Sequence, residues 1–271
     1  GGANQKTMWR VFAHRGMGMT AYTVDTEDPV PVPSFQSPLE DAQAVVTFKA
    51  IGIDEKDAPV TNARIIVGQY ATRSRGIADT DPATVVDETD DTTRLATQNL
   101  TDTATFVPGT YDFMVAAPGY GIHRFTQELK AGNSTVTFKL PSNWASTARG
   151  AVATSSASLP ENADRANETI DDSEDTGAII GDEGNVIGAW LTVDLGQERE
   201  FSHLRMSVAG GPTYAGRMQS IRSFELRTCE GECADPPKDY ETVVYTSAPD
   251  AFAGGIPRPF QPDMNIRGFD L

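Results

Sequence analysis

Apolar residues along most of the chain occur in short runs that are separated by turn residues. Residues 110–116 (TYDFMVA) approximate the alternation of apolar and polar positions that is typical of a half-buried β-strand. Pro108-Gly109 precedes this run and Pro118-Gly119 follows it, and both pairs are strong turn signals. Short strands between turns indicate antiparallel sheets packed as a sandwich. The pattern therefore predicts a mainly β protein.

Similar runs predict strands along the rest of the chain. They cover residues 45–50, 63–68, 104–107, 124–126, 134–140, 151–156, 189–196, 201–208, 220–228 and 241–247. Strand 201–208 is a candidate partner for strand 189–196. The polar stretch 72–103 is rich in Asp and Thr, and we expect it to be a surface loop.

One element differs from this β pattern, because residues 4–15 have the apolar spacing of a short amphipathic helix. Asn4 can cap its start, and Gly16 stands where a left-handed C-terminal cap belongs. A helix of this length is only marginally stable alone in water. It therefore either docks on a sandwich or is the last helix of a domain outside this chain. Its apolar face consists of Met8, Val11 and Phe12, with Trp9 and Ala13 beside them.

Composition favours folded modules, and the acidic charge is compatible with a secreted, extracellular protein, with plain solubility as the alternative reason for the charge. The chain has 271 residues, which is room for about two domains, and 39% of them are hydrophobic. No apolar run is long enough for a transmembrane helix. The formal net charge of -16 argues against nucleic acid and against anionic lipid as partners, since both require a basic surface. The acidity is compatible with calcium sites built from Asp.

Proline and charge mark the boundaries between the predicted segments. The acidic, Pro-rich stretch 28–34 cannot be a central strand, because proline lacks a backbone N–H, and it is typical of an extended linker. The predicted organisation is a helical segment over residues 1–24, a linker over 25–39, a β-sandwich over 40–140 and a second β-domain over 141–271.

The two cysteines of the chain, Cys229 and Cys233, enclose a very small loop. In an oxidising compartment this spacing predicts a disulfide across a turn, between strands 220–228 and 241–247. A metal site is the alternative, but it would need two further ligands, and no other Cys or His lies nearby in the sequence. The disulfide would stiffen one hairpin tip.

The segment 40–140 carries a recognisable motif. Residues 106–113 (FVPGTYDF), followed by 116–120 (AAPGY), resemble the signature of carboxypeptidase regulatory-like domains. The resemblance implies a transthyretin-like β-sandwich. It says little about chemistry, because in that family the module usually serves as a spacer or folding aid.

The segment 141–271 resembles discoidin-like, galactose-binding-like jelly rolls. The matching pieces are residues 153–156 (ATSS), the acidic loop 170–176 and residues 190–196 (WLTVDLG). The Trp that often follows the acidic loop is absent, and residues 177–180 (GAII) stand there. Residues 268–271 are typical of the start of a strand, so the closing strand is expected to lie outside the chain.

The acidic loop is the candidate inorganic site, because Ca²⁺ binds clustered carboxylate and carbonyl oxygens. The candidate residues are Asp171, Asp172, Asp175 and Thr176. In discoidin-like modules the matching loop often holds a structural calcium ion, and the resemblance assigns Asp171, Asp175 and Thr176 as its ligands. The alternative is a solvated acidic loop. Either role is structural rather than catalytic.

The chain contains none of the common catalytic motifs. Its three His residues are far apart in the sequence, and neither His-Glu-x-x-His nor Gly-x-Ser-x-Gly occurs. Tyr214, Arg217 and Trp144 are candidates for stacking on and hydrogen bonding to a sugar or lipid at the loops of the jelly roll, with ordinary packing as the alternative. The partner considered for the chain is an extracellular glycan or protein substrate.

The helical segment carries the strongest functional indication. Residues 9–18 (WRVFAHRGMG) resemble the last helix of the catalytic domain of fungalysin-like zinc metallopeptidases. The resemblance implies that the zinc ligands and catalytic Glu precede Gly1, so that zinc belongs only to the absent catalytic domain. The β-rich remainder offers no obvious groove for this helix. We therefore expect the catalytic domain to pack on its apolar face.

Two functions follow as expectations. The first is a non-catalytic accessory region of a secreted fungalysin-like zinc metalloendopeptidase, which stabilises or targets the protease. The second is a stand-alone extracellular carbohydrate-binding or adhesion module.

Overall fold

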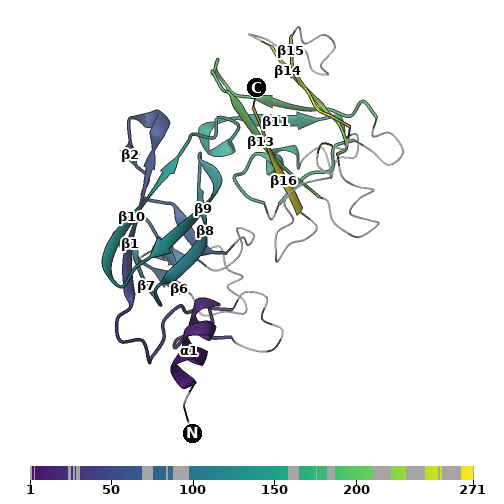
Figure 1. Ribbon diagram of the computed structural model, residues 1–271. Coiled ribbons are helices and arrows are strands. Elements are labelled where there is room, and N and C mark those ends of the chain that lie inside the picture. Colours follow the sequence, from purple (N-terminus) through teal and green to yellow (C-terminus); the bar gives the residue numbers. More distant parts are fainter. Residues whose placement is uncertain are drawn as a thin grey trace. The chain divides into compact units, whose positions relative to one another are not determined.

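The computed structural model describes residues 2, 4–23, 26, 28, 31–68, 76–83, 85–87, 98–157, 165–174, 176–181, 187–209, 221–229, 242–249, 251 and 264–270. It divides the chain into two compact units, Gly1–Asn143 (unit 1) and Trp144–Leu271 (unit 2). Strands dominate both units, and α1 (Gln5–His14) is the single α-helix among the described residues (Figure 1). The predicted fold class, mainly β with a short N-terminal helix, is confirmed.

Unit 1 contains ten strands among its described residues. These are β1 (Ala44–Gly52), β2 (Ala58–Pro59), β3 (Arg64–Val67), β4 (Ala78–Asp79), β5 (Val85–Asp87), β6 (Gln98–Leu100), β7 (Thr103–Phe106), β8 (Gly109–Ala117), β9 (Gly121–Leu129) and β10 (Gly132–Leu140). One sheet has the order β10-β1-β2 with β7 paired to β1, the second has the order β4-β3-β8-β9, and β5 and β6 form a separate pair. A 3₁₀ turn, η1 (Ile53–Glu55), follows β1.

The apolar runs and turn residues of the sequence predicted most of these strands correctly, but two features of the fold differ from the prediction. The stretch 72–103, expected to be a loop, contains the short strands β4, β5 and β6 among its described residues. In addition, β1 and β10 pair in parallel from Ala44↔Gly132 to Gly52↔Leu140. The chain passes from one sheet to the other between β9 and β10, so β10 runs beside β1 in the same direction. The first sheet is therefore mixed rather than purely antiparallel.

The core of unit 1 lies between its two larger sheets and is rich in aromatic rings. Along β1 the residues Ala44, Val46, Phe48 and Ala50 are buried, as the period of two predicts for one face of a strand. The ring of Phe48 lies 5.5 Å from that of Phe113 on the opposite sheet. It also lies 5.9 Å from the ring of Phe138 on β10. Phe48 therefore joins both sheets.

Residues 31–39, the continuously described part of the predicted linker 25–39, pack on the sandwich of unit 1. Among its described residues, Ser34, Phe35 and Ser37 are buried, and Phe35 belongs to the core of unit 1. The amide of Val107 donates to the carbonyl of Phe35 over 2.8 Å. The prolines predict an extended backbone but do not reveal the buried residues that follow Pro33. The predicted linker is wrong in this respect, because the stretch packs on the sandwich.

Unit 2 contains three two-stranded antiparallel sheets among its described residues. Its elements are η2 (Thr147–Arg149), β11 (Val152–Ser155), η3 (Ala166–Thr169), β12 (Leu191–Asp194), β13 (His203–Ala209), β14 (Glu225–Thr228), β15 (Thr242–Thr246) and β16 (Met264–Asp270). The sheets are β11-β12, β13-β16 and β14-β15. Strand 201–208 was the candidate partner for strand 189–196, but β13 pairs with β16 and β12 pairs with β11. Of the supposed strand start at 268–271, residues 268–270 belong to the seven-residue strand β16.

Truncation of the central core ring should destabilise unit 1 strongly. We expect Phe48→Ala to lower its free energy of unfolding by about 3–5 kcal/mol, because the change removes apolar contacts and leaves a cavity. Urea unfolding followed by near-ultraviolet circular dichroism measures this loss. Ile53→Ala, at a half-exposed position of the same unit, is the control and should cost less than about 1 kcal/mol. Equal losses for the two variants would contradict the assigned core.

Candidate functional site

Helix α1 docks on the sandwich of unit 1 through its more polar side. Lys6, Arg10, Ala13 and His14 recur at the spacing that places residues on one side of a helix, here called the inner side. Ala13 is fully buried in the core. Arg10 Nη2 donates to the carbonyl of Pro108 over 3.1 Å, and Lys6 pairs with Asp41. The expectation that the β-rich remainder offers no place for the helix is therefore wrong.

An aromatic contact completes the inner side. The imidazole of His14 stacks on the ring of Tyr111 with 4.5 Å between the centroids, and its Nε2 donates to the carbonyl of Thr110 over 3.1 Å. Gly109 makes the close approach possible, since a Cβ at that position would lie 3.0 Å from His14 Nε2. The backbone at Pro108 and at the start of β8 thus supplies the acceptors that hold the helix.

The end of α1 fixes the direction in which the chain leaves it. Gly16 has a positive φ of 81°, as predicted for a C-terminal cap. The amide of Met17 donates to Phe12 O, and the amide of Gly16 donates to Ala13 O, which is the Schellman pattern. Asn4, in contrast, forms no side-chain cap. Gly18 then donates to the carbonyl of Ser34 over 2.7 Å, so the helix is tied to the extended stretch packed on the core.

The apolar side of α1 faces away from the sandwich. Met8, Val11 and Phe12 remain 55%, 49% and 43% exposed. The exposed apolar residues continue into the segment after the helix. We call the whole set the outer apolar face; it consists of Met8, Val11, Phe12, Met17, Met19 and Tyr22.

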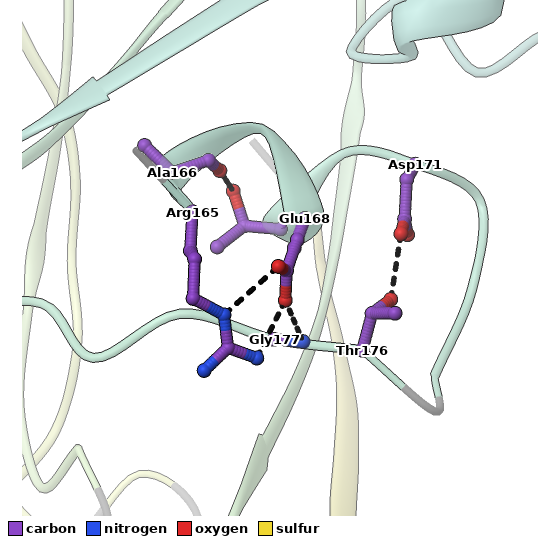
Figure 2. A network of polar contacts seen from close by, with 7 residues as sticks. Arg165, Ala166, Glu168, Asp171, Thr176 and Gly177 are labelled. Carbon is purple, nitrogen blue, oxygen red and sulfur yellow. Dashed lines mark hydrogen bonds and ion pairs between the residues drawn. The ribbon is translucent and has the colours of Figure 1, made fainter. Parts of the chain in front are cut away.

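The acidic loop of unit 2 is closed by polar contacts at its base (Figure 2). Arg165 donates to both carboxylate oxygens of Glu168, over 2.8 and 2.7 Å. The amide of Gly177 donates to Glu168 Oε2 over 3.3 Å. The hydrogen bond from Arg165 is the main cause that lowers the pKa of Glu168 below its ordinary value. The Gly177 contact joins the two ends of the loop, and the exposed ion pair lies on the side of the loop that precedes residue 170.

Two of the three predicted calcium ligands come together within this loop. Thr176 Oγ1 donates to Asp171 Oδ2 over 2.6 Å, as Figure 2 shows, and the amide of Ser173 donates to Asp171 Oδ1 over 2.9 Å. Asp172 has a positive φ of 62° and accepts a hydrogen bond from the buried hydroxyl of Ser146. The third predicted ligand, Asp175, lies outside the described residues. The described part of the chain contains no group of three Asp, Glu, His or Cys residues that could hold a metal ion.

Three of the remaining predicted site residues, Tyr214, Arg217 and Cys233, lie outside the described residues. Cys229 directly follows β14, and the described part of the chain contains no free cysteine. The Cys229–Cys233 disulfide stays a prediction, although the paired strands β14 and β15 form the hairpin on which it would lie.

The arginines around Trp144 were not predicted from the sequence. Arg149 lies 4.9 Å and Arg199 lies 4.1 Å from the centre of the Trp144 ring, so cations contact this ring in place of a ligand. Arg199 is distant from Trp144 in the sequence and belongs to none of the motifs identified there. The arrangement favours ordinary packing for Trp144 rather than the ligand-stacking role that was considered for it.

Comparison with known proteins gives no relative, since no protein-family model matches the chain and no curated protein matches it. Separately, none of the described helices has the length and apolar character needed to cross a membrane.

The docking residue Tyr111 should make unit 1 sensitive to alkaline pH. Burial raises the pKa of its phenol well above the ordinary value of 10.0, although nearby Arg10 opposes this shift. The folded state therefore keeps the phenol proton at a pH where the unfolded chain loses it. The resulting stability is present below pH 10.0 and is lost as the pH rises above that value.

The measurement compares unfolding of the wild type and Tyr111→Phe by urea between about pH 8 and about pH 11. We expect stability to fall less steeply with pH in Tyr111→Phe than in the wild type. The control is Tyr22→Phe, which changes an exposed tyrosine and should keep the wild-type slope. A wild-type slope in Tyr111→Phe would contradict the assigned burial of this phenol.

Proposed function

We propose that this chain is the non-catalytic accessory region of a secreted fungalysin-like zinc metalloendopeptidase, and that it stabilises or targets the protease. The single observation that carries the proposal is the direction of α1. Its inner side is held by the sandwich, while Met8, Val11 and Phe12 point outward. A helix normally buries its apolar stripe, so an outward stripe favours a second protein surface as its cover.

The sequence of the same element supports the identity of that surface. Residues 9–18 (WRVFAHRGMG) include the helix end, Gly16 and Gly18, and resemble the end of a fungalysin-like catalytic domain. Gly16 takes the left-handed cap conformation and Gly18 approaches the backbone of Ser34 and Gln36, so both glycines have a structural reason here. In the proposed arrangement the helix ends the catalytic domain and also forms part of unit 1. The zinc ligands and catalytic Glu belong to the absent domain.

The coding frame before Gly1 tests the proposal directly. We expect it to encode His-Glu-x-x-His, and a signal peptide placed immediately before Gly1 would contradict the proposal. The catalytic domain, produced separately, should then unfold at a higher temperature when the 271-residue chain is added. At a chain concentration of about 100 times the Kd, linkage gives roughly 2.7 kcal/mol of stabilisation. Serum albumin at equal concentration is the control. Zinc-dependent proteolysis by the chain alone would overturn the assignment.

We further propose that Asp171, Asp175 and Thr176 hold a structural calcium ion. The two described residues fit this role in part, because their side-chain oxygens already face each other across the loop. A bound calcium ion would add a further contact between Asp171 and Thr176, which one hydrogen bond now joins. Oxygen donors of this type suit calcium rather than a transition metal.

Calcium should raise the unfolding temperature of unit 2, and EDTA should reverse the increase. We expect Asp171→Asn to lose most of this shift, because the neutral amide is a weaker calcium ligand. The matched control is Asp194→Asn, which changes an exposed carboxylate on β12 of the same unit. Differential scanning calorimetry with and without calcium makes the comparison. A wild type that does not respond, or an unchanged shift in Asp171→Asn, would contradict the site.

A further inference from the structure

The mixed sheet of unit 1 ends in a strand with one open side. Strand β10 pairs with β1 from Gly132 to Leu140, and the register contains no bulge (Figure 1). Within the described part of the chain no strand pairs with the other side of β10, which we call the β10 edge. In a parallel pair the backbone groups of alternate residues point to opposite sides of the strand. The β10 edge therefore presents a row of N–H and C=O groups that can take a further strand.

The sequence of β10 lacks most features that protect an exposed sheet edge. Protected edge strands are short, bulged or rich in proline and charged side chains. Strand β10 is nine residues long, contains no proline and has one charged residue, Lys139. Lys139 points outward, because its neighbours Phe138 and Leu140 are buried in the core. The β10 edge is therefore suited to strand addition.

The inward side of the β10 edge is apolar. Strand β9 is the last strand of the second sheet, and its Phe125 ring lies 4.8 Å from the Phe138 ring of β10. Phe125 and Val136 pack against the core but are only partly buried. Because side chains alternate along a strand, an added strand would turn every second side chain toward these two residues. Apolar side chains at those positions would complete the cover of the core.

The outward side of the β10 edge is polar, and β10 contains no Asp or Glu. Its outward residues are all exposed, and they are Asn133, Thr135, Thr137 and Lys139. Lys49 lies opposite Thr137 on β1 and shares this face. Among the described residues, neither lysine belongs to an ion pair. An acidic side chain on the outward side of an added strand would therefore meet cations that have no competing carboxylate.

We propose that the β10 edge binds an extended segment of a partner protein as an added strand, in which apolar residues face the core and acidic residues face outward. Main-chain hydrogen bonds supply the affinity of such a contact, and the alternation of side chains supplies its specificity. A second copy of β10 fits less well, because it has no acidic residue to place beside Lys139. Two chains that each carry a charge of -16 also repel one another. The inference uses only contacts within unit 1 and does not depend on the proposed function.

Hydrogen exchange measured by nuclear magnetic resonance tests the added strand directly. The probe is a capped peptide as long as β10, in which valine and glutamate alternate. We expect every second backbone amide of β10 to exchange rapidly in the 271-residue chain and to become protected when the peptide is added. The control is β8, which lies between β3 and β9, and its amides should not change. A peptide that leaves the β10 amides unprotected would overturn the inference.

The outward charge is tested by fluorescence anisotropy with the same peptide. Lys139→Glu should weaken binding about tenfold, and this loss should shrink at high salt. The matched control is Lys56→Glu, which makes the same change of charge at an exposed residue that follows η1 and lies outside β10. It should bind like the wild type, and circular dichroism verifies that both variants are folded. Equal losses in the two variants would trace the effect to net charge and contradict the assigned contact.

The other possible occupant, a second copy, is tested with the chain alone. We expect sedimentation velocity to show a monomer and the exchange of the β10 amides to be independent of chain concentration. Protection of β10 that grows with concentration would assign the edge to a second copy and overturn the inference. None of these outcomes bears on the accessory function, which the upstream coding frame tests separately.

Discussion

A continuous set of aromatic contacts determines how unit 1 is built. The ring of Phe48 contacts Phe113 across the sandwich, and Phe106 lies 6.2 Å from Phe48. Phe106 lies 5.0 Å from Tyr111, on which the imidazole of His14 stacks. The contacts therefore extend from the middle of the core to the N-terminal helix. Because the core rings pack edge to face or tilted and the imidazole of His14 stacks on the last of them, these contacts determine the position of α1 as well as the spacing of the sheets.

The same contacts explain why α1 docks through polar residues. One end of the sandwich, where the chain passes from β7 to β8, carries the ring of Tyr111 and the carbonyls of Pro108 and Thr110. A surface of carbonyl oxygens and one aromatic ring is complementary to donors and an imidazole rather than to Met or Val. Ala13 is small enough to be buried between them. The sandwich thus selects the inner side of the helix and leaves the apolar side outside.

Local patterns in the sequence were sufficient for most strands of unit 1, because alternation and turn pairs act over a few residues. The parallel pairing of β1 with β10 was not accessible in this way, since it joins residues about 88 positions apart and depends on where the chain changes sheets. The helix itself was predicted, but its docking side was not. Apolar spacing indicates the stripe that should be buried, whereas Arg10 and His14 bind backbone carbonyls that have no sequence signature.

The contacts of the acidic loop were predicted from the sequence only in part. Asp171 and Thr176 were selected from their spacing, and they do meet, because five residues of loop suffice to bring them together. The tie between Arg165 and Glu168 was not foreseen, although both residues are close in sequence. Ion pairs at this spacing are common on exposed surfaces and contribute little individually, so they do not stand out in a sequence.

The two units differ in how their described residues are stabilised. The fully buried residues of unit 1 include Phe48, Phe106, Phe113 and several large aliphatic side chains. The buried hydrophobic residues described in unit 2 are mostly alanines, with Ile170 and Val208 as the larger members. Apolar burial therefore supplies less stabilisation per residue there, in proportion to the smaller area removed from water. Among the described residues of unit 2, hydrogen bonds such as the one from Ser146 to Asp172 add to this smaller apolar contribution.

The fixed position of α1 has a consequence for binding. A free helix of ten residues is marginal in water, so a partner that had to order it would lose affinity to the entropy of folding. Here the sandwich has already ordered the helix through its inner side, independently of the outer apolar face. A partner then meets a preformed surface in which the methionines can still adapt their side chains. Rigid backbone and adaptable side chains together favour an extended, specific contact over one that forms only as the helix folds.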